Sequence, residues 1–299
     1  MRYGFVGLGN LGGKLAGRLL GAGFPVSVFD LDSAAMAPLT ELGAIAAPDL
    51  QTLASTVDHV ITCLPSPSVS EQVQEMVLPV MAEGASLIEM STVAKADVLA
   101  SAARAESHGV GFLELPVTGG VHLAARGELT LLVGGGAEWV ALHRPVLDVM
   151  GNQLFHMGPA GSAALIKVIT NMLAFIHLSA CGEALMLAGA GGLDLATAWQ
   201  AIAASSGTSF VHETEGQLIL NGSYDIGFTI DLALKDLGFA AGFGEEFGVP
   251  LALAQQVQAQ FEAARDTYGG DAQSPYVVKL LEDALGRPLR APGFPAQLV

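Results

Sequence analysis

Near its beginning, the chain passes from a short apolar run into a glycine-rich segment and then into a helical pattern. The run is Tyr3–Val6, the glycine segment Gly7–Gly12 has the spacing GxGxxG, and the helical pattern covers Leu11–Ala22. In a strand that turns tightly into a helix, the first glycine allows the turn, the second lets the backbone approach a phosphate, and the third allows close helix–strand packing. The segment therefore predicts a strand–helix unit that opens an α/β sheet.

The rest of the first half repeats this alternation. Short apolar runs predict strands, and longer stretches with helical periodicity lie between them. The predicted strands are Tyr3–Val6, Val26–Phe29, Val60–Cys63, Ser86–Ile88, Gly111–Leu113 and Leu131–Val133, and the predicted helices are Leu11–Ala22, Ser33–Leu42, Val69–Met81, Lys95–Ser107 and Glu138–Met150. Strands that alternate with helices favour right-handed crossovers, so we expect a doubly wound parallel sheet over residues 1–160.

From Gly161 onward the pattern is helical. Residues 161–191 form one long stretch rich in Ala, Leu and Met, and four further helical patterns follow at Asp194–Ala204, Thr229–Phe247, Leu251–Tyr268 and Ser274–Leu285. Residues 286–299 contain three prolines and predict an irregular tail. We therefore expect a second, all-α domain over 161–285 that begins with a long interdomain helix at 161–191.

Composition excludes several classes of protein. Hydrophobic residues make up 51% of the 299 residues, which is too much for a disordered chain. Thirteen basic and 29 acidic side chains give a net charge of −16, which disfavours nucleic acid and anionic membranes as partners. The longest charge-free runs contain several polar residues and do not resemble the ~20-residue apolar span that a bilayer requires. We expect a cytoplasmic protein.

Cysteine and histidine spacing argues against metal and disulfide chemistry. Cys63 and Cys181 are far apart and form no CxxC pattern, so we interpret them as structural thiols in a reducing compartment. The seven histidines show neither HxxxH nor HExxH spacing, so no metal site is predicted.

The glycine segment predicts a dinucleotide site in which Gly7, Gly9, Asn10, Leu11 and Gly12 receive the pyrophosphate at a helix N-terminus. Asp30 follows the second predicted strand, 23 positions after Gly7, where an acidic residue binds the ribose hydroxyls and repels a 2′-phosphate. This predicts NAD, with NADP less favoured. The alternative is that Asp30 caps the helix that begins at Ser33, which leaves the nucleotide preference open.

Two later loops fall where a dinucleotide would cross the sheet. Leu64, Pro65 and Ser66 follow the strand at 60–63, and Ser91 and Thr92 follow the strand at 86–88. Ligands of open α/β sheets bind beyond the carboxyl ends of the strands, so both loops are candidates for cofactor contacts. Without that context, each is only a strand-ending loop.

Two segments carry candidate groups for chemistry. Thr118, Gly119 and Gly120 form a turn whose N–H groups and hydroxyl suit a carboxylate. Lys167 and Asn171 lie one helical turn apart, and Lys167 stands among apolar neighbours. Desolvation lowers the pKa of a lysine and allows it to exchange a proton near neutrality. The alternative is a lysine that extends to solvent beside an interhelical asparagine.

Together these motifs resemble the β-hydroxyacid dehydrogenase family, which includes 3-hydroxyisobutyrate dehydrogenase and tartronate semialdehyde reductase. The resemblance extends to about Leu285. It rests on six motifs in order: Gly7–Gly12, Leu64-Pro65, Ser91-Thr92, Pro116–Gly120, Gly158–Asn171 and Lys235-Asp236. It implies a Rossmann domain, a long connecting helix, a helical domain, and an active site in the cleft between the domains. It also implies hydride transfer between NAD(P) and a small 3-hydroxy acid or semialdehyde, in a homodimer or homotetramer.

The resemblance also assigns roles to single residues. Lys167 matches the family's catalytic lysine, which handles the proton of the substrate hydroxyl, and Asn171 matches its partner in orienting the substrate. Thr118, Gly119 and Gly120 match the substrate-carboxylate loop. Lys235 resembles a lysine that reaches the cofactor from the helical domain, and Phe228 is expected to line the pocket nearby.

His122 departs from the family pattern, because relatives commonly have small residues just after the two glycines. We interpret it as a rim residue that sets specificity; a general acid is the alternative. Two other functions compete with the dehydrogenase. Imine reductases of the same fold usually replace the lysine with an acid or a tyrosine. Non-catalytic nucleotide-binding modules typically lose the lysine, so Lys167 argues against both.

Overall fold

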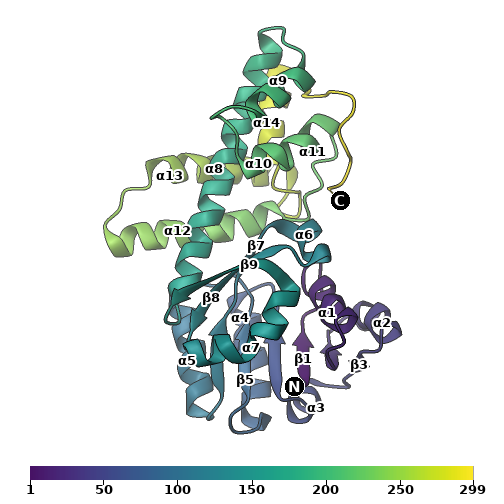
Figure 1. Cartoon of the computed structure of the whole chain (residues 1–299). Coiled ribbons are helices and arrows are strands. Elements are labelled where there is room, and N and C mark those ends of the chain that lie inside the picture. The colour runs from purple at the N-terminus through teal and green to yellow at the C-terminus, as the bar shows by residue number, and fades with distance from the viewer. Residues whose placement is uncertain (299) are drawn as a thin grey trace. The chain divides into compact units, whose positions relative to one another are not determined.

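A computed structural model describes residues 1–298, and the chain divides into two compact units, Met1–Lys167 and Val168 onward. Each unit is described by itself. The first is an α/β unit built on one sheet, and the second is helical (Figure 1). The predicted fold class, a doubly wound sheet followed by helices, is confirmed.

The sheet of the first unit has nine strands, and six of them are parallel in the order β3-β2-β1-β4-β5-β6. They are β1 (Tyr3–Val6), β2 (Val26–Phe29), β3 (Ile45–Ala46), β4 (His59–Thr62), β5 (Ser86–Glu89), β6 (Gly111–Glu114), β7 (Val117–Thr118), β8 (Leu129–Gly135) and β9 (Gly151–Gly158). Beyond β6 the sheet is mixed, because β8 runs antiparallel to β6 and β7 and pairs in parallel with β9.

The parallel strands end in register. Val6 pairs with Phe29 and Thr62, Thr62 pairs with Glu89, and Glu89 pairs with Glu114. Each of these is the last residue of its strand, so the loops that follow share one edge of the sheet. The strand order reverses between β1 and β4, and ligands of open α/β sheets bind at such a switch point.

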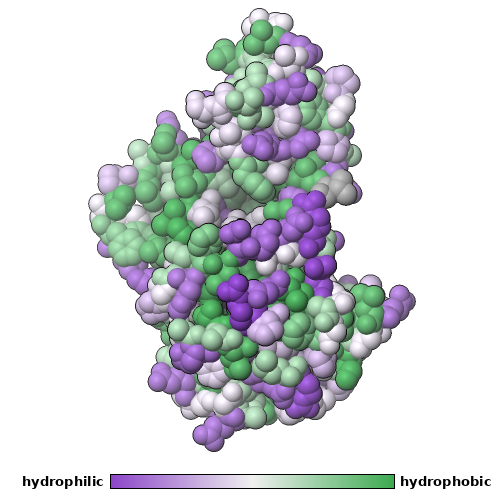
Figure 2. Space-filling model, in the orientation of Figure 1, coloured by the Kyte–Doolittle hydropathy of each residue, from purple (hydrophilic) through white to green (hydrophobic). Residues whose placement is uncertain are grey.

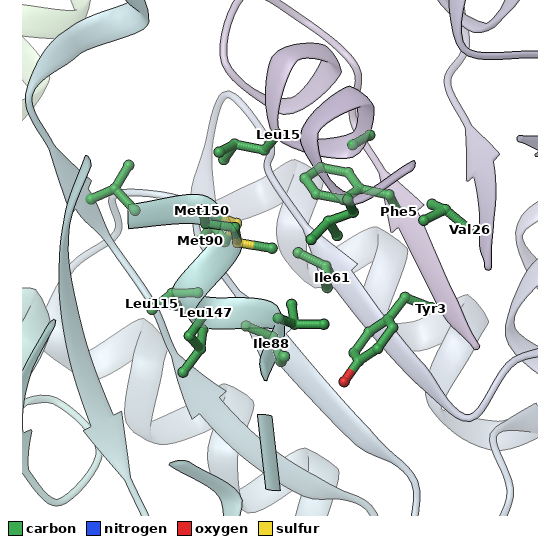
Figure 3. Close-up of a cluster of buried hydrophobic side chains, with 14 of the residues drawn as sticks. Tyr3, Phe5, Leu15, Val26, Ile61, Ile88, Met90, Leu115, Leu147 and Met150 are labelled. Carbon is green, nitrogen blue, oxygen red and sulfur yellow. The ribbon is translucent and has the colours of Figure 1, made fainter. Parts of the chain in front are cut away.

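Helices cover both faces of this sheet (Figure 1). They are α1 (Gly12–Gly21), α2 (Ser33–Glu41), α3 (Leu50–Thr56), α4 (Pro67–Val77) with the short 3₁₀ turn η1 (Leu78–Val80), α5 (Lys95–Ser107), α6 (Gly120–Arg126) and α7 (Ala137–Met150). Residues on α1 and α7, such as Leu15 and Leu147, are fully buried against Phe5, Ile61 and Ile88 of the strands (Figure 3). This burial, at roughly 25 cal/mol per Å² of apolar surface, is the main source of stability.

Several short elements were not predicted. β3 and β7 have two residues each, and the strand β9 is mostly exposed, so none shows the alternation that identifies a strand from sequence. The turn predicted at Thr118–Gly120 connects the last residue of β7 to the first residue of α6, with Gly119 as the N-cap of that helix. The strand predicted at Val60–Cys63 is His59–Thr62, one residue earlier.

A buried polar network lies at the opposite, amino-terminal end of the strands. Tyr3 and Ser86 contact the two ring nitrogens of His143 at 3.0 and 2.7 Å, and Ser86 also contacts His59 at 2.9 Å. If Tyr3 donates to His143, His143 to Ser86, and Ser86 to His59, every one of these contacts is satisfied with both imidazoles neutral. We call these four residues the amino-end network.

The second unit is built from helices. They are α8 (Ser162–Ala190), whose first turns belong to the first unit, then α9 (Leu195–Ala203), α10 (Phe210–Glu213), α11 (Glu215–Asn221), α12 (Ile230–Phe247), α13 (Ala252–Tyr268) and α14 (Tyr276–Leu285). Its core joins side chains of these helices, among them Phe175, Leu185, Leu237 and Phe261. After α14 the described chain is irregular, although Leu289 is fully buried in this core.

Helix α8 is long and apolar enough, by length and composition alone, to cross a bilayer, a test that the core helix of a soluble protein also passes. Apolar side chains are also exposed where α12 meets α13, a region that is green in Figure 2. The residues concerned are Phe247, Val249 and Leu253. The second unit therefore presents apolar surface that it does not bury within itself.

Candidate active site

The glycine segment has the geometry that a dinucleotide requires. Gly7 has φ +90°, and a Cβ there would lie 2.3 Å from the carbonyl oxygen of Cys63; a Cβ on Gly12 would lie 2.0 Å from that of Gly7. At Gly9, by contrast, no described atom lies within 4 Å of the Cβ position. Gly7 and Gly12 are thus required by packing within the chain, and Gly9 leaves open space beside the N-terminus of α1. These residues fit a bound pyrophosphate.

Asp30 lies directly beside this segment. Its carboxylate accepts hydrogen bonds from the backbone N–H of Leu8 at 2.6 Å and of Asp32 at 2.9 Å. The helix α2 is capped instead by Asp32, which accepts from the N–H of Ala34. The alternative that Asp30 caps this helix is therefore wrong. Asp30 holds a position at the end of β2, next to the glycine turn, from which it can meet a ribose.

The two loops predicted to contact the cofactor are tied together. The N–H of Leu64 donates to the hydroxyl of Ser91 at 2.8 Å, and Ser66 caps α4 by accepting from Val69. Below them lies Glu89, only 1% exposed, which accepts from the N–H of Ser91 at 2.8 Å. The side chains of Ser70 and Gln74 on α4 also donate to Glu89. Pro65 and Thr92 lie in the same two loops.

The predicted carboxylate turn begins at Thr118, which pairs with Thr130 of β8. Gly119 and Gly120 have φ values of +125° and +83°, which are left-handed conformations that favour glycine. The ring of His122 packs back onto Gly120, where a Cβ would meet its Nδ1 and Cε1 at 3.3 Å. Burial lowers the pKa of His122, so the imidazole beside this turn favours its neutral form.

Lys167 lies in the second turn of α8 and is 8% exposed. The first turn of the helix is held by Glu114, whose two carboxylate oxygens accept from the N–H groups of Ala163 and Ala164, both at 2.9 Å. Glu114 ends β6 and precedes Thr118 by four residues. Within the first unit, one strand end therefore connects the carboxylate turn to the helix that carries the lysine.

Asn171, one turn further along α8, belongs to the second unit. Its side-chain amide donates to Asp236 of α12 at 2.6 Å, and Asp236 is 1% exposed. Lys235 lies beside it, with its Nζ 3.4 Å from the other oxygen of Asp236. The buried Asp236 side chain can thus fix the amide orientation of Asn171, so that the carbonyl oxygen of Asn171 faces away from it.

Phe228 precedes α12 in the same unit. Its ring centroid lies 6.0 Å from that of Phe175 on α8, and its backbone N–H donates to the side-chain oxygen of Gln273 at 3.0 Å. The sequence-predicted residues of this unit, Asn171, Phe228 and Lys235, thus cluster around α8 and the start of α12.

Sequence reasoning missed the residues that support the site. Glu89 and Glu114 are fully buried carboxylates at strand ends, and Asp236 was quoted only as part of a motif. A charged residue that directly ends an apolar run was the available indication for the two glutamates. Among the described residues, no group of three or more His, Cys, Asp or Glu side chains could hold a metal ion. The arrangement instead suits a nucleotide and an anionic substrate.

Comparisons with known proteins agree with this geometry. Residues 2–158 match the family model for the NAD binding domain of 6-phosphogluconate dehydrogenase. Residues 161–281 match the model described as NAD-binding of NADP-dependent 3-hydroxyisobutyrate dehydrogenase. The first model lies within the first unit, whereas the second begins at the end of the first unit and covers most of the second.

Individual relatives are similar over nearly the whole chain. The chain is 33% identical to 2-(hydroxymethyl)glutarate dehydrogenase of Eubacterium barkeri, over 96% of each protein. It is 36% identical to 3-hydroxyisobutyrate dehydrogenase of Pseudomonas aeruginosa, over 85% of this chain and 86% of that protein. A solved structure of Mycobacterium tuberculosis 3-hydroxyisobutyrate dehydrogenase with L-serine is 29% identical, has a TM-score of 0.85, and is covered to 98% by 94% of this chain.

Proposed function

Because the chain belongs to the β-hydroxyacid dehydrogenase family, and is an NAD(P)-dependent oxidoreductase of small hydroxy acids, we propose that it oxidises a 3-hydroxy acid to the semialdehyde with NAD and that Lys167 handles the proton. The observation that carries this proposal is the position of Lys167. It is a buried lysine one turn before Asn171, on a helix whose start is held by a strand end of the nucleotide-binding unit.

The chain's own groups account for the proton transfer and for the charge on the substrate oxygen in such a reaction. When bound, the nicotinamide supplies the acceptor for the hydride. Neutral Lys167 accepts the hydroxyl proton as the carbonyl forms, and its ammonium returns the proton in the reverse direction. The same ammonium stabilises negative charge that develops on the substrate oxygen. Asn171, which donates one amide N–H to Asp236, donates its other N–H to that oxygen.

The substrate carboxylate is assigned to the turn that begins at Thr118. Gly119 and Gly120 allow backbone N–H groups to face one anion, and the Thr118 hydroxyl adds a third donor. His122 packs on this turn and so limits the size of the group beside the carboxylate. In this proposal His122 sets specificity and Phe228 supplies an apolar wall, whereas Lys235 approaches the cofactor.

NAD is proposed over NADP because of the charge at the end of β2. Asp30 lies beside the glycine turn, and Asp32 adds a second carboxylate two residues later. Between Phe29 and Met36 there is neither Arg nor Lys to neutralise a 2′-phosphate. A ribose 2′-hydroxyl can donate to Asp30, whereas a phosphate there would be repelled.

The test measures reduced nicotinamide formation with NAD and with NADP on a panel of 2- and 3-hydroxy acids at mildly alkaline pH. We expect turnover of at least one 3-hydroxy acid, with a higher kcat/KM for NAD. If no acid of the panel reacts while NAD still binds, the dehydrogenase proposal fails. An imine panel run in parallel then tests the reductase alternative directly.

We also propose that the protein self-associates, as a homodimer or homotetramer in the cytoplasm. Leu173 and Leu187 of α8 are 43% and 76% exposed, and the end of α12–α13 adds further apolar surface. Exposed apolar area of this kind is typical of subunit interfaces. Light scattering coupled to size exclusion gives the mass, and a monomer at micromolar concentration would contradict this proposal.

A further inference from the structure

Glu114 is a carboxylate enclosed by the protein on every side. It is 1% exposed, and its oxygens accept from the N–H groups of Ala163 and Ala164. A Cβ on Gly134 of β8 would lie 2.0 Å from its Oε1, so only glycine at that position leaves space for the carboxylate. Burial raises the pKa of Glu114, and the amides of residues 161–164 act in the opposite direction. Burying a carboxylate costs free energy unless hydrogen bonds compensate, so its presence here indicates that the bonds to α8 matter.

Glu114 is connected to two parts of the candidate site, to Lys167 through the helical turn whose amides it binds and to Thr118 through the chain. Lys167 follows Ala163 and Ala164 by one helical turn, and side chains on a helix lean toward its N-terminus. Any shift or tilt of the first turn of α8 therefore moves the amine. Four residues after Glu114, which ends β6, the chain reaches Thr118 of the carboxylate turn at the end of β7. One carboxylate thus sets the spacing between the lysine and the turn.

The neighbouring strand provides a matched carboxylate with different partners. Glu89 ends β5, pairs in register with Glu114, and is equally buried. Its partners, however, are the N–H of Ser91, in the loop that follows β5, and the side chains of Ser70 and Gln74 on α4. The two groups are alike in strand position, burial and charge. They differ in what they hold.

We propose that Glu114 is a positioning residue of the oxidoreductase, which fixes Lys167 relative to the Thr118–Gly120 turn by binding the first amides of α8. The inference rests on the proposed roles of Lys167 and of that turn. It assigns to Glu114 an effect on the chemical step alone, with little effect on nucleotide affinity.

The test compares Glu114→Gln with the wild type. Glutamine has the same size, but its amide nitrogen cannot accept an N–H, so one of the two bonds to α8 is lost together with the charge. Because a misplacement of about 1 Å can cost about 100-fold in rate, we expect kcat to fall about 10- to 100-fold. The dissociation constant for NAD should stay within about 2-fold. Glu114→Asp keeps the charge but is one methylene shorter, and it should retain more of kcat than the glutamine variant.

Two variants serve as controls. Glu89→Gln removes the matched carboxylate and should weaken NAD binding, with a smaller loss of kcat at saturating nucleotide. Glu106→Gln alters an exposed carboxylate on α5 and should change neither constant. The positioning role is overturned if Glu114→Gln keeps the wild-type kcat. It is also overturned if Glu114→Gln and Glu89→Gln lower kcat and NAD affinity in the same proportion, because a purely structural role predicts that result.

A readout that does not depend on turnover separates this inference from the proposed function. Acetic anhydride labels lysines, and mass spectrometry gives the rate for Lys167 relative to the exposed Lys14. We expect Glu114→Gln to change this ratio several-fold and to speed amide exchange at Ala163 and Ala164, whereas Glu89→Gln changes neither. If the wild-type protein turns over no hydroxy acid, the proposed function is contradicted. If the labelling rate of Lys167 relative to Lys14 is unchanged in Glu114→Gln, the positioning role is contradicted, whether or not turnover is found.

Discussion

The two ends of the central sheet both contain buried polar groups, but these groups are of opposite kinds. At the carboxyl ends, Glu89 and Glu114 bind backbone amides of the segments that form the candidate site. At the amino ends, Tyr3, His59 and Ser86 are the first residues of β1, β4 and β5; Tyr3 and Ser86 bond to His143, and Ser86 also bonds to His59. The carboxyl ends hold neighbouring backbone segments through buried carboxylates, whereas the amino ends contain a network of uncharged side chains.

This difference shows how one set of strands can carry two tasks. A carboxylate that binds loop amides holds backbone in place without occupying the space above the sheet, where ligands of α/β folds bind. A buried chain of neutral donors and acceptors, in contrast, uses most of its hydrogen-bonding groups within the protein core. We therefore expect substitutions at the carboxyl ends to change activity and substitutions at the amino ends to change stability.

The largest effect is expected for Lys167→Ala. Removal of a general acid/base typically costs 10²- to 10⁴-fold, so we expect kcat to fall about 1000-fold while the dissociation constant for NAD changes little. Steady-state kinetics and fluorescence titration give the two quantities. Lys279→Ala, which breaks an exposed pair with Asp283, serves as the control. Equal losses of turnover and NAD binding would show that the lysine is structural.

At the other end of the sheet, His143→Phe should affect stability without affecting the rate. The ring keeps its approximate volume, but Tyr3 and Ser86 each lose the imidazole as a partner, although Ser86 keeps His59; a buried polar group that loses its partner costs about 1–3 kcal/mol. We expect a loss of about 3 kcal/mol in the free energy of unfolding, measured with urea. At temperatures well below the unfolding transition, kcat should equal that of the wild type. A lower kcat in folded His143→Phe would contradict the expectation that the amino ends of the strands affect stability but not activity.

Much of this division could be predicted from the sequence at the carboxyl ends, because glycine spacing reports directly on backbone geometry. Gly7 and Gly12 were predicted at a tight turn and a close contact, and the positive φ of Gly7 and the short Cβ distances at both agree. The resemblance to a family then supplied Lys167 and Asn171. The long helix predicted at 161–191 is Ser162–Ala190.

The supporting groups could not be predicted in the same way. Glu114 and Ala163 are 49 positions apart, and Tyr3 and His143 are 140 apart, so no local pattern connects either pair. Histidines at 59 and 143 show no common spacing; the order of β1, β4 and β5 places Tyr3, His59 and Ser86 side by side, and His143 reaches them from α7. The strand β9 was missed because its side chains are mostly exposed. Contacts between residues far apart in the chain thus depend on strand pairing and helix packing, which periodicity along the chain does not reveal.

Acid should affect the amino-end network first. Burial and the nearby His59 lower the pKa of His143 to about 3, from 6.5. Below pH 6.5 the unfolded chain therefore binds a proton that the folded protein does not, so stability is fully present above that pH and falls as pH decreases toward 3. At about 1.4 kcal/mol per pH unit, His143 alone costs about 2 kcal/mol between pH 6.5 and roughly pH 5.

Urea unfolding at several pH values tests this slope. In His143→Phe it should be shallower by the contribution of one proton, whereas His108→Phe, which changes an exposed histidine at the end of α5, should leave it unchanged. An identical slope in the wild type and in His143→Phe would assign the acid sensitivity to other groups, with His59, whose pKa burial also lowers, as the next residue to change.

The smallest effect is expected at Asp30, a carboxylate at a strand end that can both hold backbone and bind a ligand. Asp30 already accepts from the N–H of Leu8, so it supports the glycine turn and can also meet the ribose. Asp30→Ala removes both functions, whereas Asp30→Asn keeps an acceptor for Leu8 but removes the charge. If repulsion of a 2′-phosphate sets the preference, both variants should lower the ratio of kcat/KM for NAD over NADP about 10-fold, because one charge-assisted hydrogen bond is worth roughly 1.5–3 kcal/mol. If only the alanine variant shifts the ratio, turn support and not charge governs the choice, and Asp30 resembles Glu89 in holding backbone.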